Sequence, residues 1–530
     1  MSRGLKPEIT KAMRPNMLDR VIGYFNPVAG LQRQQARGMS AVMGGYTGAS
    51  RRSSWGRKWQ VSKGDANTDL LPDLPTLRER SRDLVRNNPV ATGAINTAVT
   101  NVVGSGLRLQ STVDAKALGM SDEEAEQWQA HTEREFLLWA GSKYCDLTGV
   151  QNFSGLQDLA FRSSLENGDS FGVLPEKAVQ GSPYKTRVQL IEADQVCNKD
   201  GKPNSATLAG GIETDSDGAP VGLQVMVSHP GSPKAERKWQ VVPFRGGNTG
   251  RVNVVHLFER KRVGQLRGVP YLASVIEPLK QISRYTESEL MAAVVSGMFT
   301  VFVKTEAGQG GLLGPNDIEQ AGVQGAQSVE RNYQLGNGLV LEGAPGDSIE
   351  TINPGRPNDS FDPFVHAILK QVGVALEIPY EVLMKAYLSS YSAARAALLD
   401  AWRFFRKRRQ WLAANFCQPI YETWLAEAVA LGRVHAPGFF ADPAIRAAYC
   451  RALWHGDGPG AIDPLKEANA AEKRMNIRIT NLAQEKAAYD GGDWEQTVRQ
   501  RKRELSMIGE TGQAANDSTP EPPFNPDDPQ

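Results

Sequence analysis

The sequence predicts an α+β protein in which helices predominate. Long stretches with apolar residues at helical spacing occupy most of the chain. A central region, residues 171–259, changes to a period of two, which is typical of strands. Hydrophobic residues make up 40% of the 530 residues and charged residues 22%, so the chain can bury a substantial core and has room for several domains.

The charge balance disfavours a tight nucleic-acid clamp. Lysine and arginine number 60 against 59 acidic residues, which leaves a formal charge of +1. Proteins that bind nucleic acid by neutralising phosphates usually carry a clear basic excess. Weak or transient contact with DNA stays open, because a balanced total can hide one basic and one acidic face.

Cysteine usage and apolar runs predict a reduced protein without a membrane span. The four cysteines are far apart and lack C-x-x-C spacing, so we expect free thiols. The N-terminus lacks the continuous apolar region of a secretion signal. The longest apolar stretch, Met291–Val303, is interrupted by polar residues and falls short of the roughly 20 residues that a membrane helix needs.

The first half of the chain contains several helix start signals. Residues 1–70 are rich in Gly, Ser and Arg and predict a flexible arm. Helices are expected to begin at Thr76, which has capping-box spacing to Glu79, and at Asn88-Pro89. The pairs Ser121 with Glu124 and Ser154 with Gln157 repeat the capping-box spacing, and Asn167-Gly168 is expected to end the last of these helices.

A β-rich lobe and a long helical segment are expected next. Asp217-Gly218 predicts a hairpin turn within the lobe. Pro270 is expected to open a helical segment through Met298 that breaks or kinks at Pro278. Short β-like runs follow at Phe299–Val303 and Leu339–Glu342.

The second half is predicted to be helical. Asp362-Pro363 starts a helix that Pro379 ends. After a polar hinge at Leu388–Ser392, a helix of some 35 residues is expected to reach about Ala430, with Trp402, Phe405, Leu412 and Phe416 on one stripe. Helical character returns from Asp463 to Arg503, before an acidic, proline-rich tail from about Glu510.

Motifs that would carry catalysis are weak. Gly168–Gly172 matches the G-x-S-x-G nucleophile elbow, but a helix precedes it and a strand follows, which is the reverse of the order that an elbow needs. We therefore interpret it as an ordinary helix-to-strand turn. The six histidines lack metal-ligand spacing and no G-x-x-x-x-G-K-[ST] phosphate loop exists, so no metal, no cofactor and no enzymatic activity are expected.

One basic run is a candidate for nucleic-acid contact. Residues 403–409 read Arg-Phe-Phe-Arg-Lys-Arg-Arg between two tryptophans, and basic residues among aromatics can bind nucleic acid by stacking. On a helix, Arg403, Arg406 and Lys407 fall opposite the buried stripe, which favours a solvated or interface face instead.

Several segments resemble the lambda-type family of phage portal proteins. They occur in the family's order between about residues 75 and 490. The segments are Asp83–Asn88, Asn167–Asp169, Val255–Glu259, Gly264–Gly268, Ile378–Tyr387, Ser390–Ala396, Trp402 with Arg408-Arg409, and Ile462–Glu467. The departures lie in the first 70 residues, in residues 304–338 and in the tail.

The resemblance implies the portal fold of wing, stem, clip and crown, assembled as a dodecameric ring around a DNA channel. Carried over, it gives these ranges: arm 1–70, wing 71–265, first stem helix 266–298, clip 299–359, second stem helix 360–378, tunnel loop and flanks 379–395, long helix returning to the wing 396–460, crown 461–509, and tail 510–530. The residues that this assigns to the narrowest point of the channel are Lys385, Tyr387, Ser389, Ser390, Tyr391 and Arg395. A simple connection between helices is the alternative for these six residues.

The resemblance also implies a function and partners. The ring would sit at one capsid vertex of the virion, after assembly in the host cytoplasm, and would pass double-stranded DNA during packaging and ejection. Expected partners are the terminase large subunit, head–tail connector or adaptor proteins, and the major capsid and scaffold proteins. Two other classes remain open: a soluble nucleic-acid-binding enzyme, such as a nuclease or terminase component, and a capsid shell or scaffold protein.

Overall fold

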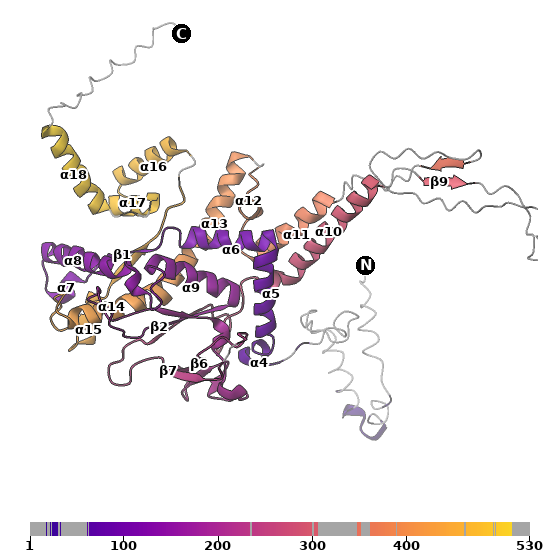
Figure 1. The fold of residues 1–530 in the computed structure, drawn as a ribbon, viewed down its shortest axis with the longest axis horizontal. Coiled ribbons are helices and arrows are strands. Elements are labelled where there is room, and N and C mark those ends of the chain that lie inside the picture. The colour runs from indigo at the N-terminus through magenta and orange to yellow at the C-terminus, as the bar shows by residue number, and fades with distance from the viewer. Residues whose placement is uncertain are drawn as a thin grey trace, which may run out of the picture. The chain divides into compact units, whose positions relative to one another are not determined.

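The computed structural model describes residues 63–233, 236–298, 361–387, 390–460, 463–490 and 494–510, with short stretches elsewhere. The chain divides into two units, residues 1–65 and 66–530, and the second holds every element from α4 onward. Helices predominate over short antiparallel sheets, which confirms the predicted α+β class (Figure 1). The predicted strand at Leu339–Glu342, most of the arm and the tail lie outside the described residues.

The first helices follow the start signals with one shift. Helix α4 (Ala66–Leu70) leads into α5 (Leu74–Asn87) and α6 (Pro89–Val102). The capping box predicted at Thr76 is wrong, because α5 begins two residues earlier with a proline in its first turn. Asn88 caps α6 as predicted, and its side chain accepts a hydrogen bond from the Ala91 amide at 2.9 Å.

Two further helices precede the strands. After strand β1 (Arg108–Ser111) and the short α7 (Ala115–Leu118), α8 (Asp122–Ala140) carries the predicted capping box of Ser121 and Glu124. Helix α9 spans Phe153–Asn167, and its cap is Asn152 rather than the predicted Ser154. Gly168 ends α9 at φ 85°, in the left-handed region that glycine adopts without strain.

The β-rich lobe contains two antiparallel sheets. In the first, β2 (Asp169–Val173) lies between β3 (Gln189–Ile191) and β8 (Val254–Phe258). The second joins β4 (Leu208–Ala209), β5 (Ile212–Thr214), β6 (Pro220–Met226) and β7 (Trp239–Pro243) in that order. Gly218, at φ 83°, lies in the predicted turn between β5 and β6. Strand β1 pairs with the distant β11 (Ala452–His455), a pairing that the sequence did not predict.

Helices α10 (Ile276–Met298) and α11 (Phe361–Ala375) lie side by side (Figure 1). The predicted break at Pro278 is wrong: this proline lies in the first turn of α10, where its missing N–H would have no helical partner anyway. Between the helices, β9 (Phe302–Thr305) pairs with β10 (Asp347–Glu350). Helix α11 ends at Ala375, before Pro379, and Pro379 is the N-cap residue of the short α12 (Tyr380–Met384).

The predicted long helix is present as three consecutive segments. Helix α13 (Tyr391–Leu412) continues through one π-helical turn, Ala413–Cys417, into α14 (Gln418–Ala430). Pro419 follows the π turn and has no N–H for the carbonyl of residue 415, so the wider turn accommodates the missing bond. The remaining helices are α15 (Pro443–Tyr449), α16 (Pro464–Asn476), α17 (Leu482–Asp490) and α18 (Trp494–Glu510).

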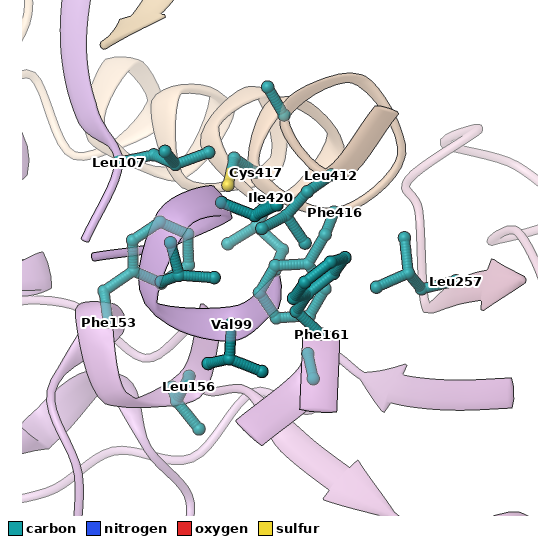
Figure 2. Close-up of a cluster of buried hydrophobic side chains, with 14 of the residues drawn as sticks. Val99, Leu107, Phe153, Leu156, Phe161, Leu257, Leu412, Phe416, Cys417 and Ile420 are labelled. Carbon is teal, nitrogen blue, oxygen red and sulfur yellow. The ribbon is translucent and has the colours of Figure 1, made fainter. Parts of the chain in front are cut away.

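The main core joins α6, α8 and α9 to the α13–α14 helix. Figure 2 shows Val99, Phe161 and Phe416 converging from three of these helices. Phe136 lies within 5.0 Å of Trp424, ring centre to ring centre. All four cysteines are free thiols, and burial raises the pKa of Cys145 to about 12. Among the described residues, no helix is both long and apolar enough to span a bilayer.

Candidate functional site

The predicted channel residues lie between α12 and α13. Lys385 ends α12 in the left-handed region, at φ 54°, with its side chain exposed. Tyr387 and Tyr391 are 49% and 53% exposed. Ser390 is the residue before α13, and its hydroxyl lies 3.2 Å from that of Ser392. Ser389 lies outside the described residues.

Arg395 occupies the first turns of α13 and is half-buried. It lies near Asp463, the residue that caps α16. A hydrogen bond from the Lys466 side chain, with a smaller contribution from Arg395, lowers the pKa of the Asp463 carboxyl. The beginning of α13 is therefore close to the beginning of α16, although 68 residues of sequence separate Arg395 from Asp463.

The basic run of α13 divides between two faces. Arg403, Arg406 and Lys407 are exposed, opposite a buried face that includes Trp402 and Phe405, as the helical spacing predicted. Their contact with DNA remains a prediction. The structure brings these three cations together on one helix face.

Arg408 lies on the buried face, which the sequence reasoning missed. Its guanidinium forms an ion pair with Glu259 at 3.0 Å and lies over the rings of Phe404, Trp411 and Tyr271 at 5.3, 5.9 and 6.0 Å. Tyr271 in turn donates a hydrogen bond to the carbonyl of Leu376. Arg408 thereby joins α13 to the end of β8 and to the bases of α10 and α11. The sequence signal that could have placed Arg408 on the buried face is its helical spacing from Phe404 and Leu412.

Arg409 closes the end of α6. Its Nε donates to the carbonyl of Val102 at 3.0 Å, and its Nη2 donates to the carbonyls of Asn101 at 2.9 Å and Asp457 at 2.8 Å. The last carbonyls of a helix have no partner within it, so a guanidinium is well suited to this position. Burial lowers the pKa of Arg409.

A buried ionic junction surrounds Asp169, directly after the Gly168 turn. Its carboxylate accepts hydrogen bonds from Arg78 at 2.5 Å, Arg267 at 2.8 Å, His256 at 2.8 Å and the Gly268 amide at 2.7 Å. Asp169 has no exposed side-chain area, and Arg78 and Arg267 expose only 5% and 2% of theirs. The junction connects α5, β2, β8 and the segment before α10.

Electrostatics at this junction favour a fixed structural role. Burial by itself would raise the pKa of Asp169, but Arg267, His256 and Arg78 outweigh it and hold that pKa well below its usual range. Burial lowers the pKa of His256, which keeps the ring neutral near pH 7. Neighbouring Ser170 is buried in β2, and the strand follows the helix. The G-x-S-x-G match is therefore a helix-to-strand turn, as predicted.

Glu192, Asp194 and His229 bring potential metal-ligand atoms within 4.8 Å of one another. Arg82 already forms ion pairs with both carboxylates. The Gly231 amide donates to His229 Nδ1 at 3.0 Å, so Nδ1 is unprotonated. A histidine that binds metal through Nε2 almost always carries its proton on Nδ1 and donates it to an acceptor. This cluster fits an ion-pair network better than a metal site.

Comparisons with known proteins agree on one family. The model of a family described as "Phage portal protein, lambda family" matches residues 52–409. The chain is 27% identical to Portal protein B of Escherichia phage lambda, across 84% of this chain and 86% of that protein. It is 26% identical to the Portal protein of Escherichia phage N15, across 84% and 87%.

Solved structures with a similar chain come from gene transfer agent particles. One, the virion of a native gene transfer agent particle, has a TM-score of 0.38 and 13% identity, covering 84% of this chain and 91% of that chain. Another, the neck of an empty particle computed with C6 symmetry, has a TM-score of 0.41 and 15% identity, covering 69% and 92%.

Proposed function

Because the chain belongs to the lambda family of phage portal proteins, we propose that twelve copies form a closed ring that passes double-stranded DNA into and out of the phage head. The observation that carries this proposal is the family match over residues 52–409. Two relatives named as portal proteins, each aligned over 84% of the chain, support it.

Exposed apolar side chains on several helices support assembly from repeated copies. Apolar patches of this kind commonly mark protein interfaces. On α10 and α11 they are Leu290, Met291, Val294, Phe364 and Val374. Among α16–α18 and their connections they are Leu465, Ile477, Ile479, Leu482, Tyr489, Val498, Leu505 and Met507. Neighbouring copies in a ring would cover both sets.

Size and charge are compatible with a DNA conduit. Twelve helices, each about 10 Å across, give a ring with an opening of roughly 25–30 Å, which is enough for a duplex. Each neutralised phosphate strengthens a salt-dependent grip on DNA, so a strongly basic channel would slow sliding. The formal charge of +1 fits a channel better than a clamp.

We assign the parts of the ring as follows. The wing is residues 71–265, α10 and α11 belong to the two stem segments, 266–298 and 360–378, and the clip lies between them at 299–359. Residues 379–395 form the tunnel loop and its flanks, where Lys385, Tyr387, Ser390, Tyr391 and Arg395 face the DNA together with Ser389. Residues 396–460 return to the wing, and α16–α18 form the crown, 461–509.

The ring performs no bond-making chemistry in this proposal. A separate terminase would dock on the clip and drive DNA through the channel, and head–tail connector proteins would replace it after packaging. Major capsid and scaffold proteins would surround the ring at the portal vertex of the virion, after assembly in the host cytoplasm.

Negative-stain electron microscopy of the purified protein, with its mass measured in parallel, tests the proposal. We expect closed rings with a central hole and about twelve subunits. Hexamers and pentamers would instead indicate a shell protein. A persistent monomer or dimer under assembly conditions would contradict the ring, and assays of ATP and DNA hydrolysis would then test the enzyme alternative.

A further inference from the structure

A glycine-rich linker, Gly456–Gly460, connects β11 to α16 and is held by its aspartate. The Asp457 carboxylate accepts hydrogen bonds from the Ser105 amide and from the Ser105 hydroxyl, both at 2.7 Å. Ser105 lies three residues beyond the end of α6. The Asp457 side chain is 42% exposed, so water can compete for it when the contact opens.

The backbone of the linker is held by the same guanidinium that closes α6. Arg409 donates to the carbonyls of Asn101, Val102 and Asp457 at once, so the end of α6 and the linker share one cation. Hydrogen bonds that involve a charged group are stronger than those between neutral groups. The side chain of Asp457 thus binds Ser105, and its backbone carbonyl binds Arg409, so the two parts of this residue are held separately near the end of α6.

Close packing leaves no room for a side chain at Gly456 and Gly458 of the linker, or at Gly104 beside it. A Cβ on Gly104 would overlap the Asp457 carboxylate, and one on Gly456 would lie 2.8 Å from Arg409 Cζ. A Cβ on Gly458 would overlap the carbonyl oxygen of Tyr489, at the end of α17. The linker therefore touches α6 on one side and the end of α17 on the other.

A further contact joins α18 to α8 and is more exposed. Arg499 of α18 pairs with Glu126 of α8, but the two side chains are 47% and 54% exposed. Exposed ion pairs contribute little to stability, because water screens both charges. None of the described side chains of α16–α18 is buried. Between α18, α8 and β1 lies an open cleft of about 1980 Å³.

We propose that Asp457 and Arg409 form a latch that positions the C-terminal helices α16–α18 on the wing. When Asp457 leaves Ser105, α16–α18 lose this attachment and move together, so that the cleft against α8 opens. The latch deepens the proposed function because it names the contacts that set the position of the crown helices. It rests on the proposed function only where the crown is given a role in DNA packaging.

Hydrogen exchange measured by mass spectrometry on the full-length protein tests the latch. In Asp457→Ala, we expect amide exchange across the linker and α16–α17 to rise about tenfold, because a hydrogen bond to a charged group is lost. The matched control, Glu126→Gln, removes the exposed ion pair and should change exchange there by less than about threefold. Equal effects of the two variants would overturn the latch.

Two further variants separate the latch from general unfolding and from local fraying. Ser105→Ala keeps the amide donor, so we expect a smaller rise in the same segments, while α9 stays protected. A thiol crosslinker between Glu126→Cys and Arg499→Cys in the Asp457→Ala protein should restore slow exchange in α17. Continued fast exchange would show that the helices do not move as a unit. Ring formation is scored separately by microscopy, so failure of the ring and failure of the latch are distinguishable.

Discussion

Asp169 holds together segments that are far apart in the sequence, because one carboxylate binds Arg78 from α5 and Arg267 from the segment before α10. Removing one partner from a buried ionic cluster leaves the others uncompensated, which costs about 3–5 kcal/mol. We therefore expect Asp169→Asn to lower the free energy of unfolding by about that amount in urea titrations. Asp217→Asn, at an exposed turn, is the control and should change it by less than about 0.5 kcal/mol. Similar values for both variants would contradict the junction's role.

The same junction should make the protein sensitive to acid. Burial lowers the pKa of His256 below its usual 6.5. Between these two pKa values the residue is protonated in the unfolded chain and neutral in the folded chain. Burial would raise the pKa of Asp169, but its partners, Arg267 above all, hold that pKa well below the usual 3.8. The stabilisation that the ionised carboxylate provides is therefore lost as pH falls toward that low value. Stability therefore declines below about pH 6.5 because of His256, and the contribution of Asp169 is lost only below about pH 3.8.

The dependence of stability on pH during acidification isolates the contribution of His256. One proton that binds only to the unfolded chain changes the unfolding free energy by up to about 1.4 kcal/mol per pH unit. We expect the melting temperature to fall between pH 6.5 and 5, and His256→Gln to flatten that fall, since glutamine takes up no proton. Melting curves recorded at several pH values check this. An unchanged slope in the variant would assign the acid sensitivity to other groups.

Helix α13 depends on Arg408 for its attachment to the neighbouring elements. Arg408→Met would remove the ion pair with Glu259 and the contacts with three aromatic rings. Because Glu259 is 35% exposed and can be hydrated, we expect a loss of about 2 kcal/mol in unfolding free energy. Arg406→Met, the same change on the exposed face of the same helix, should cost less than about 0.5 kcal/mol. Equal losses would place the attachment elsewhere.

At the scale of single elements, sequence signals predicted the helix starts and ends that depend on local backbone chemistry. Asn88, the pair Ser121–Glu124 and Gly168 begin or end helices as expected, since each acts on its own backbone. Pro278 was misjudged because a proline in a first turn and one in a helix interior look alike when the start of the helix is uncertain.

Contacts between distant elements could not be predicted. The pairing of β1 with β11, and the meeting of Arg78, Asp169 and Arg267, depend on tertiary packing that one sequence does not reveal. The exposed face of Arg403, Arg406 and Lys407 followed from helical spacing. Arg408 and Arg409 were grouped with them because charge alone does not separate a solvated cation from one that joins two elements.

The segment between α12 and α13 carries the residue assignments that most need a functional test. If it is the tunnel loop, deleting Leu388–Ser390 should spare ring assembly, because the deletion leaves the described residues of α11 and α13 intact. Packaging or retention of DNA in the head should fall. Particles counted by microscopy and DNA content measured by absorbance check the two parts. Normal genome-filled heads from the deletion variant would defeat the assignment.

At the scale of the whole molecule, the exposed apolar residues of α10 and α11 are expected to lie between copies of the chain. Leu290 is 66% exposed and Val374 is 81% exposed, so a charge at either position should leave the isolated subunit folded. Within a ring the same charge would be buried without a partner, which is strongly unfavourable. We expect Leu290→Asp with Val374→Asp to convert rings into single subunits, seen by mass photometry, with little change in melting temperature of the subunit. Val263→Asp is the matched control, since Val263 is 98% exposed and lies in the turn after β8 rather than on either helix. Rings that survive the double change, or that are lost equally in the control, would show that α10 and α11 do not form the contact between copies.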